Sequence, residues 1–212
     1  MLRLSKTLAV AAALSLGALA TGASAATLSI AGGASVAVPG HFDPRPAVDL
    51  PSDRLTRFQA THNFGAIGGG LMVDGPARVT YTLLGREASA VNMLKSDGQV
   101  LLSLASPGAS IHTRQEGGFL DFVFRTSLLG PNLFPGIANG GASDNKDLAL
   151  VFSSIFNDGR SVIAAFDDGR RDFDHDDLVV RVDVAPVPVP AAGVLLAGAL
   201  GVMGALRRPR RA

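Results

Sequence analysis

Residues 148–184 read LALVFSSIFNDGRSVIAAFDDGRRDFDHDDLVVRVDV, and this stretch decides the fold. Two apolar runs, Leu148–Phe156 and Val162–Phe166, flank the turn Asn157-Asp158-Gly159. Asp-Gly between apolar runs is a strong β-hairpin signal, because these residues tolerate the positive φ angles of a tight turn. In the third segment, Leu178–Val184, alternate residues form one apolar face and the residues between them, Val179, Arg181 and Asp183, form the other. The stretch therefore predicts three successive strands.

Further strands of the same kind lie upstream. The clearest of them are Arg78–Leu84, Gln99–Leu104 and Phe119–Arg125. In the last of these, the predicted core face consists of Leu120, Phe122 and Phe124. No stretch of residues 26–186 has a helical apolar period, and turn signals, among them 19 of the chain's 25 glycines, recur at roughly ten-residue spacing. The pattern predicts an all-β domain of about seven or eight short strands, a jelly-roll-like β-sandwich.

Charge divides the chain into three parts. The middle part, residues 26–190, holds 13 of the 19 basic residues and all 18 acidic ones, so its net charge is −5 although that of the whole chain is +1. A net-acidic domain argues against nucleic-acid binding and is compatible with cation binding. The chain has no cysteine, which excludes disulfides, thiolate zinc ligands and cysteine nucleophiles. Ca²⁺ is one way to stabilise an exported domain without disulfides.

The first 25 residues have the pattern of a secretory signal peptide. Arg3 and Lys6 precede the largely apolar run Leu8–Ala20, and Ala23-Ser24-Ala25 fits cleavage by signal peptidase after Ala25. The alternative is an uncleaved anchor helix.

The last 27 residues, 186–212, form a three-part tail. Pro186–Pro190 favours an extended conformation. The 16 uncharged residues of Ala191–Leu206 would make a helix of about 24 Å, and counting from Val187 lengthens it to about 30 Å, enough to span a bilayer. The arginines beyond it would stay cytoplasmic, so the domain would face outward.

This order of PVPVPAAG, a short apolar helix and RRPRR resembles the VPLPA-CTERM variant of the PEP-CTERM sorting signals of Gram-negative bacteria. The resemblance implies processing by an exosortase, an integral-membrane transpeptidase. Val189 stands where the variant usually has Leu. The implied recognition segment is Val187, Pro188, Val189, Pro190 and Ala191. A plain C-terminal membrane anchor is the alternative.

The densest polar stretch is Asp167–Asp177. Its alternating carboxylates follow the start of a calcium-binding loop, but Asp177 stands where an EF-hand has Gly and Asp183 where it has Glu. We therefore predict a Ca²⁺ loop of another kind, with the candidate ligands Asp168, Asp172, Asp174, Asp176 and Asp177. The alternative is structural, with carboxylates that cap turn amides and pair with Arg170 and Arg171.

The same stretch resembles a motif near the C-terminus of exported bacterial β-domains, F-E-D followed by D-x-D-[YF]-N-D. The resemblance rests on Phe166, Asp168, Asp172, Asp174 and Asp177, and it also implies Ca²⁺. A second segment, Thr80–Asn92, resembles a recurring segment of PEP-CTERM proteins. There Glu87 and Asn92 are predicted to serve a turn rather than chemistry.

No catalytic set is evident. The four histidines are scattered, and the chain has no G-x-S-x-G motif. The sequence thus predicts no enzyme, but a signal peptide (1–25), a β-sandwich (26–185) and a sorting signal (186–212). The protein would be held transiently at the inner membrane, then released to the cell surface or extracellular matrix, with a structural or adhesive role. The alternatives are a carbohydrate-binding module of the exopolysaccharide matrix, against which the scarcity of Trp and Tyr counts, and a secreted hydrolase.

Overall fold

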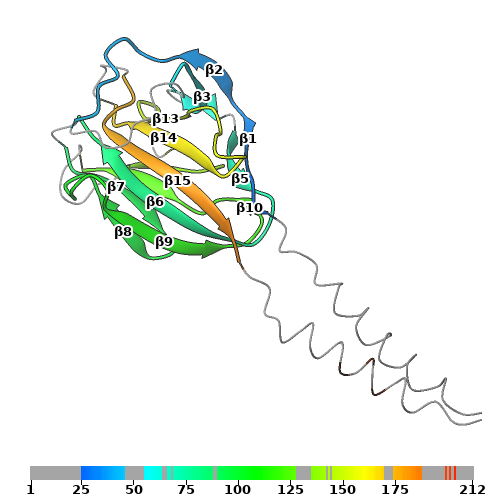
Figure 1. Ribbon diagram of the computed structural model, residues 1–212. Coiled ribbons are helices and arrows are strands. Elements are labelled where there is room, and N and C mark those ends of the chain that lie inside the picture. The colour runs from blue at the N-terminus through cyan, green and yellow to red at the C-terminus, as the bar shows by residue number, and fades with distance from the viewer. Residues whose placement is uncertain are drawn as a thin grey trace, which may run out of the picture. The chain divides into compact units, whose positions relative to one another are not determined.

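The computed structural model describes residues 25–45, 55–63, 66–67, 69–87, 90–127, 135–141, 143, 145–169, 174–187, 199, 201 and 203. In this part of the chain the fold is all-β, with three antiparallel sheets and almost no helix (Figure 1). The strands belong to one compact unit, Ala25–Pro186. A second unit combines Met1–Ser24 with Val187–Ala212, and of it only Val187, Ala199, Gly201 and Met203 are described. No described helix is long and apolar enough to cross a membrane.

The largest sheet has eight strands, all paired antiparallel. In spatial order it contains β2 (Ala34–Ala37), β3 (Arg57–Asn63), β13 (Ala149–Phe152), β14 (Ser161–Asp167), β15 (Leu178–Pro186), β6 (Ala77–Gly85) and β9 (Ser110–Gln115), with β4 (Ala66–Ile67) beside β3.

Two smaller sheets complete the domain. One contains β1 (Leu28–Gly32), β5 (Gly69–Val73) and β10 (Gly118–Phe119). The other contains β12 (Gly136–Ala138), β11 (Val123–Thr126), β7 (Asn92–Ser96) and β8 (Gln99–Leu102).

The predicted hairpin is present at the centre of the large sheet. β13 pairs with β14, and Asn157 and Asp158 adopt φ angles of 51° and 55° in the turn. The first strand is shorter than the sequence predicts, since it ends at Phe152. Beyond Phe152, the hydroxyl of Ser153 replaces a backbone oxygen as the acceptor and accepts a hydrogen bond from the Ile163 N–H at 3.0 Å.

The predicted strand Phe119–Arg125 is divided between two sheets. β10 pairs with β5, whereas β11 pairs with β7 and β12. The predicted core face is nevertheless correct, because Leu120, Phe122 and Phe124 are all buried.

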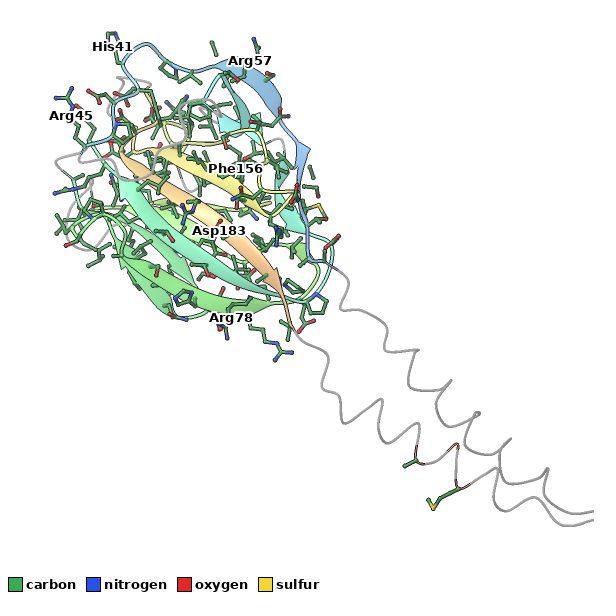
Figure 2. All side chains as sticks on the ribbon, viewed as in Figure 1. His41, Arg45, Arg57, Arg78, Phe156 and Asp183 are labelled. Atoms are coloured by element: carbon green, nitrogen blue, oxygen red, sulfur yellow. The ribbon has the colours of Figure 1, made fainter. Side chains whose placement is uncertain are left out.

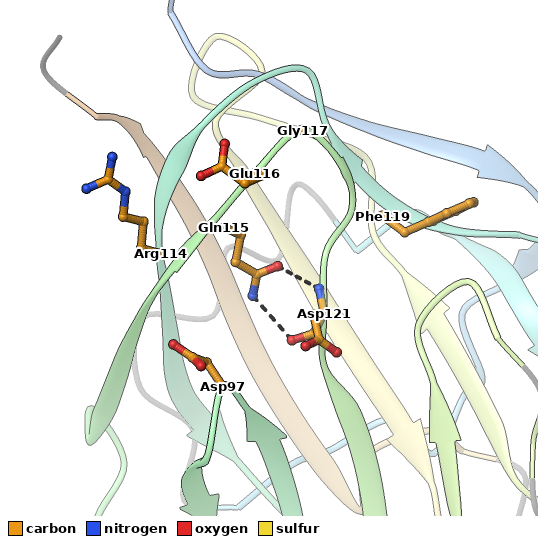
Figure 3. A pocket seen from close by; sticks show the side chains of 7 residues that line it. All are labelled: Asp97, Arg114, Gln115, Glu116, Gly117, Phe119 and Asp121. Carbon is orange, nitrogen blue, oxygen red and sulfur yellow. Dashed lines mark hydrogen bonds between the residues drawn. The ribbon is translucent and has the colours of Figure 1, made fainter.

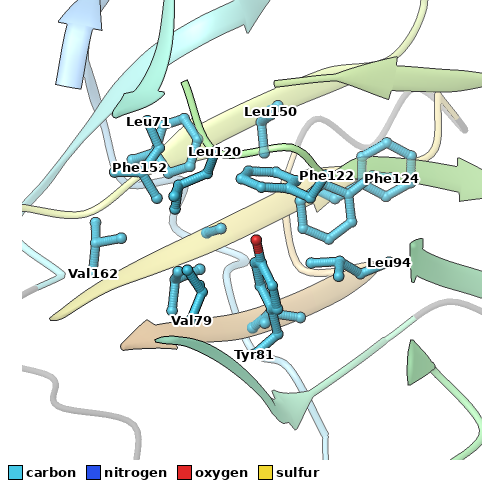
Figure 4. Packing of buried hydrophobic residues seen from close by; sticks show 14 of the residues in the cluster. Leu71, Val79, Tyr81, Leu94, Leu120, Phe122, Phe124, Leu150, Phe152 and Val162 are labelled. Atoms are coloured by element: carbon cyan, nitrogen blue, oxygen red, sulfur yellow. The ribbon is translucent and has the colours of Figure 1, made fainter. Parts of the chain in front are cut away.

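The large sheet is covered on both faces. One face packs against the two smaller sheets through a core that includes Tyr81, Phe122, Phe124, Phe152 and Phe166 (Figure 4). A second cluster on the opposite face centres on Phe58 and Ile163. All seven residues of β14 are buried as a consequence. This layering is consistent with the predicted β-sandwich.

Candidate metal centre

Three strand ends meet at one edge of the large sheet. β15 lies between β14 and β6 and runs antiparallel to both, so its start lies beside the ends of the other two strands. Leu178 pairs with Phe166 of β14, and Val179 pairs with Gly85 of β6. The acidic loop between β14 and β15 and the segment after β6 are therefore brought together.

Glu87, Asp174 and Asp176 form a group at this edge that could hold a metal ion. One carboxylate oxygen from each lies within 4.8 Å of the others. Asp174 and Asp176 are 4% and 0% exposed, whereas Glu87 is exposed. His175, between the two aspartates, has a φ of 65°, which few non-glycine residues adopt, so the loop is held here by its surroundings.

Asp176 is the most confined member of the group. Its Oδ2 accepts the Asp43 N–H at 2.5 Å, and its backbone oxygen accepts the Glu87 N–H at 2.9 Å. Its Oδ1 is buried and has no hydrogen-bond partner among the described residues. Burial raises the pKa of Asp176 to about 7; the Asp43 N–H opposes the rise, and the carboxylates of Asp174 and Glu87 add to it. A cation between these oxygens would offset both the burial and the repulsion.

Asp168 and Asp177 do not belong to this group. The Asp168 N–H donates to Asp177 Oδ2 at 2.6 Å. The side-chain amide of Asn92 donates to Asp168 Oδ2 at 3.3 Å and to the backbone oxygen of Asp177 at 3.2 Å. Both carboxylates are thus used to fix the loop, and Asn92 anchors it to β7. Asp172 lies outside the described residues.

Of the predicted ligands, the group contains Asp174 and Asp176, and it adds Glu87, which the sequence assigned to a turn. Glu87 was not assigned to the group from the sequence because the order of the strands in the sheet was not known. Arg78–Leu84 and Leu178–Val184 were both predicted as strands, and their antiparallel pairing carries Glu87 to the start of the second one. Nothing local in the sequence states that pairing.

An arginine lies near Glu87, the exposed member of the group. Arg45, labelled in Figure 2, forms an ion pair with Asp43. Its side chain is 78% exposed. The carboxylate of Asp43, and more weakly that of Glu87, raise the pKa of Arg45. The group thus consists of two buried aspartates and one exposed glutamate, and the glutamate interacts electrostatically with the guanidinium of Arg45.

No family model, no curated protein and no solved structure matches this chain. The resemblance of the tail to exosortase sorting signals therefore remains a prediction. Of the predicted recognition segment, only Val187 lies within the described residues. Residues 1–24 of the predicted signal peptide lie outside them.

A second concave region lies at the tips of two turns (Figure 3). This hollow of about 290 Å³ is lined mainly by polar side chains, namely Asp97, Arg114, Gln115, Glu116 and Asp121, together with Phe119. The Gln115 side chain fixes its floor by accepting the Asp121 N–H at 2.6 Å and donating to Tyr81 Oη at 3.0 Å. Phe119, at one side of this hollow, is 46% exposed.

Proposed function

We propose that this protein is an exported β-sandwich of jelly-roll type with a structural or adhesive role at the cell surface or in the extracellular matrix, and that Ca²⁺ bound by Glu87, Asp174 and Asp176 stabilises it. The observation that carries the cation site is Asp176 Oδ1, which is buried beside carboxylates and has no hydrogen-bond partner in the described part of the chain. A buried charge is expensive unless it is paired or coordinates a metal.

The ligand types favour calcium over other metals. All three ligands offer oxygen, and thiolates are absent from the chain. Oxygen ligands suit Ca²⁺, Mg²⁺ and Mn²⁺, and Ca²⁺ is the one that tolerates irregular geometry and a large number of ligands. Extracellular calcium modules bind with Kd of about 0.1–1 mM, so export would carry the domain to its cation.

Calorimetric titration of the purified full chain with Ca²⁺ tests the site. We expect binding heat and a raised Tm, both abolished by EDTA and both lost in Glu87→Gln. The matched control is Glu116→Gln, an exposed glutamate outside the group, which should bind as the parent does. The chain has no Trp and one Tyr, so melting is best followed by calorimetry or circular dichroism. Absence of heat in the parent protein removes the calcium proposal.

The proposed export and processing are supported by the two chain ends. Intact mass spectrometry of the protein from its native cells should find an N-terminus at Ala26 and a C-terminus upstream of Arg207. A protein of full C-terminal mass, with the arginines retained, would leave the tail as a plain membrane anchor.

Carbohydrate binding is a second candidate, which the hollow beside Phe119 favours. The carboxylates and the guanidinium of the hollow suit the hydroxyls of a sugar, and the exposed ring of Phe119, which points away from them in Figure 3, offers an apolar face beside the hollow. A glycan array with Phe119→Ala as the comparison distinguishes this activity from a purely structural role.

A further inference from the structure

The cation site is joined to a segment that covers the second face of the large sheet. We define the strap as residues 38–45. Val38 and Phe42 pack against the cluster around Phe58, and the Phe42 ring meets the Phe58 ring edge-on with centroids 5.2 Å apart. The strap thus shields part of the smaller core from water.

The backbone of the strap is held by the same two segments that carry the cation group. The Asp43 N–H donates to Asp176 Oδ2 at 2.5 Å. The Arg45 N–H donates to the backbone oxygen of Arg86 at 2.6 Å, one residue before Glu87. In turn, the Glu87 N–H donates to the backbone oxygen of Asp176. Any movement that separates Glu87 from Asp176 therefore pulls on both anchors of the strap.

We propose that the cation acts as a latch for the strap, so that its binding to Glu87, Asp174 and Asp176 holds residues 38–45 closed over Phe58. The inference rests on the proposed cation site. Without the ion, the three carboxylates repel one another and the acceptor of the Asp43 N–H is displaced along with its loop. When the ion is bound the strap stays closed, and it opens only after the ion dissociates.

This coupling has a quantitative signature in amide hydrogen exchange. If opening requires loss of the ion, protection of the strap amides rises in proportion to 1 + [Ca²⁺]/Kd, about 100-fold at 100 times Kd. A plot of log protection against log [Ca²⁺] then has a slope of about one above Kd.

The same chain provides a matched internal control. The Thr27 N–H donates to Asp74 Oδ1 at 2.8 Å, so it too is held by a carboxylate, but Asp74 is outside the cation group. Exchange measured on the full chain should slow with Ca²⁺ in peptides covering residues 42–45 and stay constant in those covering Thr27. Glu87→Gln should abolish the response, whereas Asp74→Ala should keep it while removing the side-chain acceptor of the Thr27 amide.

Two outcomes overturn the latch, and they differ in what they mean for the proposed function. Binding heat with unchanged exchange at residues 42–45 refutes the latch and leaves the cation site standing. Absence of both heat and an exchange response refutes the cation site and the latch together.

Discussion

Replacing Asp176 with asparagine should stabilise the cation-free protein and abolish its response to Ca²⁺. Burial raises the pKa of Asp176 from 3.8 to about 7, with Asp174 and Glu87 contributing. The folded state therefore holds this proton more tightly than the unfolded state, and stability is lost as pH rises from about 4 to about 7. The full loss above that range corresponds to roughly 4 kcal/mol, an upper value because the loop can relax.

Asparagine is neutral at every pH, keeps an oxygen for the Asp43 N–H and offers a donor to Asp174. We expect Asp176→Asn to unfold with about 2–4 kcal/mol more free energy than the parent near pH 8 in EDTA, a Tm higher by about 5–10 °C. Near pH 5 the difference should shrink, because Asp176 of the parent protein is then protonated.

Calcium should offset most or all of this advantage. The parent protein gains about 2.7 kcal/mol at 100 times Kd, and more of this gain appears as pH rises, because the ligands must be deprotonated. The variant should gain nothing. Urea unfolding followed by circular dichroism, with and without Ca²⁺ near pH 5 and pH 8, gives all the required free energies.

Asp158→Asn is the matched control, because this side chain is 96% exposed and its positive φ suits asparagine. It should change stability by no more than about 0.5 kcal/mol and leave the calcium response intact. A variant Asp176→Asn that is less stable than the parent near pH 8 in EDTA would refute the reasoning, since it would mean that the ionised carboxylate is satisfied in the fold.

Other changes test the fold that supports the site. Asn139→Ala should cost about 2–4 kcal/mol in urea unfolding, because its side chain accepts the Leu71 N–H at 2.7 Å and donates to the backbone oxygens of Leu71 and Leu120 at 2.8 Å each, all in the core. A cost below 1 kcal/mol would show that water replaces the amide. Gly70→Ala should cost about 1–3 kcal/mol, since an added Cβ would lie 2.5 Å from the Gly140 nitrogen, and an unchanged Tm would contradict that close approach. Phe124→Ala should cost about 3–5 kcal/mol, because it removes a fully buried ring that stacks on Phe166 at a centroid distance of 5.2 Å and leaves a cavity; a smaller loss in calorimetry would mean that the core collapses around that cavity.

Sequence periodicity located some of the strands, such as β6, β14 and β15, but not their partners, and it missed β5, β9 and β12. Alternation identified the core face of Phe119–Arg125, and that face is buried in the structure. It could not show that the chain passes from one sheet to another within the segment, because inward and outward positions alternate in the same way in either sheet. The transfer is visible only in the pairing, where the Leu120 N–H donates to Leu71 and the Asn139 N–H to Phe122.

The candidate site was limited by the same non-local information. Composition pointed to the acidic loop, because so many carboxylates in one loop repel unless something offsets them. It could not supply Glu87, which lies 87 residues before Asp174 in the sequence and reaches it only because β6 pairs with β15. Nor could it supply the amide of Asp43, which comes from a segment without any strand of its own beyond an isolated bridge.

The structural and the cation-binding interpretations of the acidic loop apply to different residues. Asp177 receives the Asp168 N–H, and Asp167 receives the Gly169 N–H at 2.8 Å, as carboxylates that cap turn amides do. Asp176 also accepts one amide, but its second oxygen is left in the interior facing other carboxylates. Turn capping therefore accounts for part of the acidic composition, but it leaves Asp176 Oδ1 buried beside Asp174 and Glu87. This buried oxygen, rather than the number of aspartates, is the reason to look for a cation.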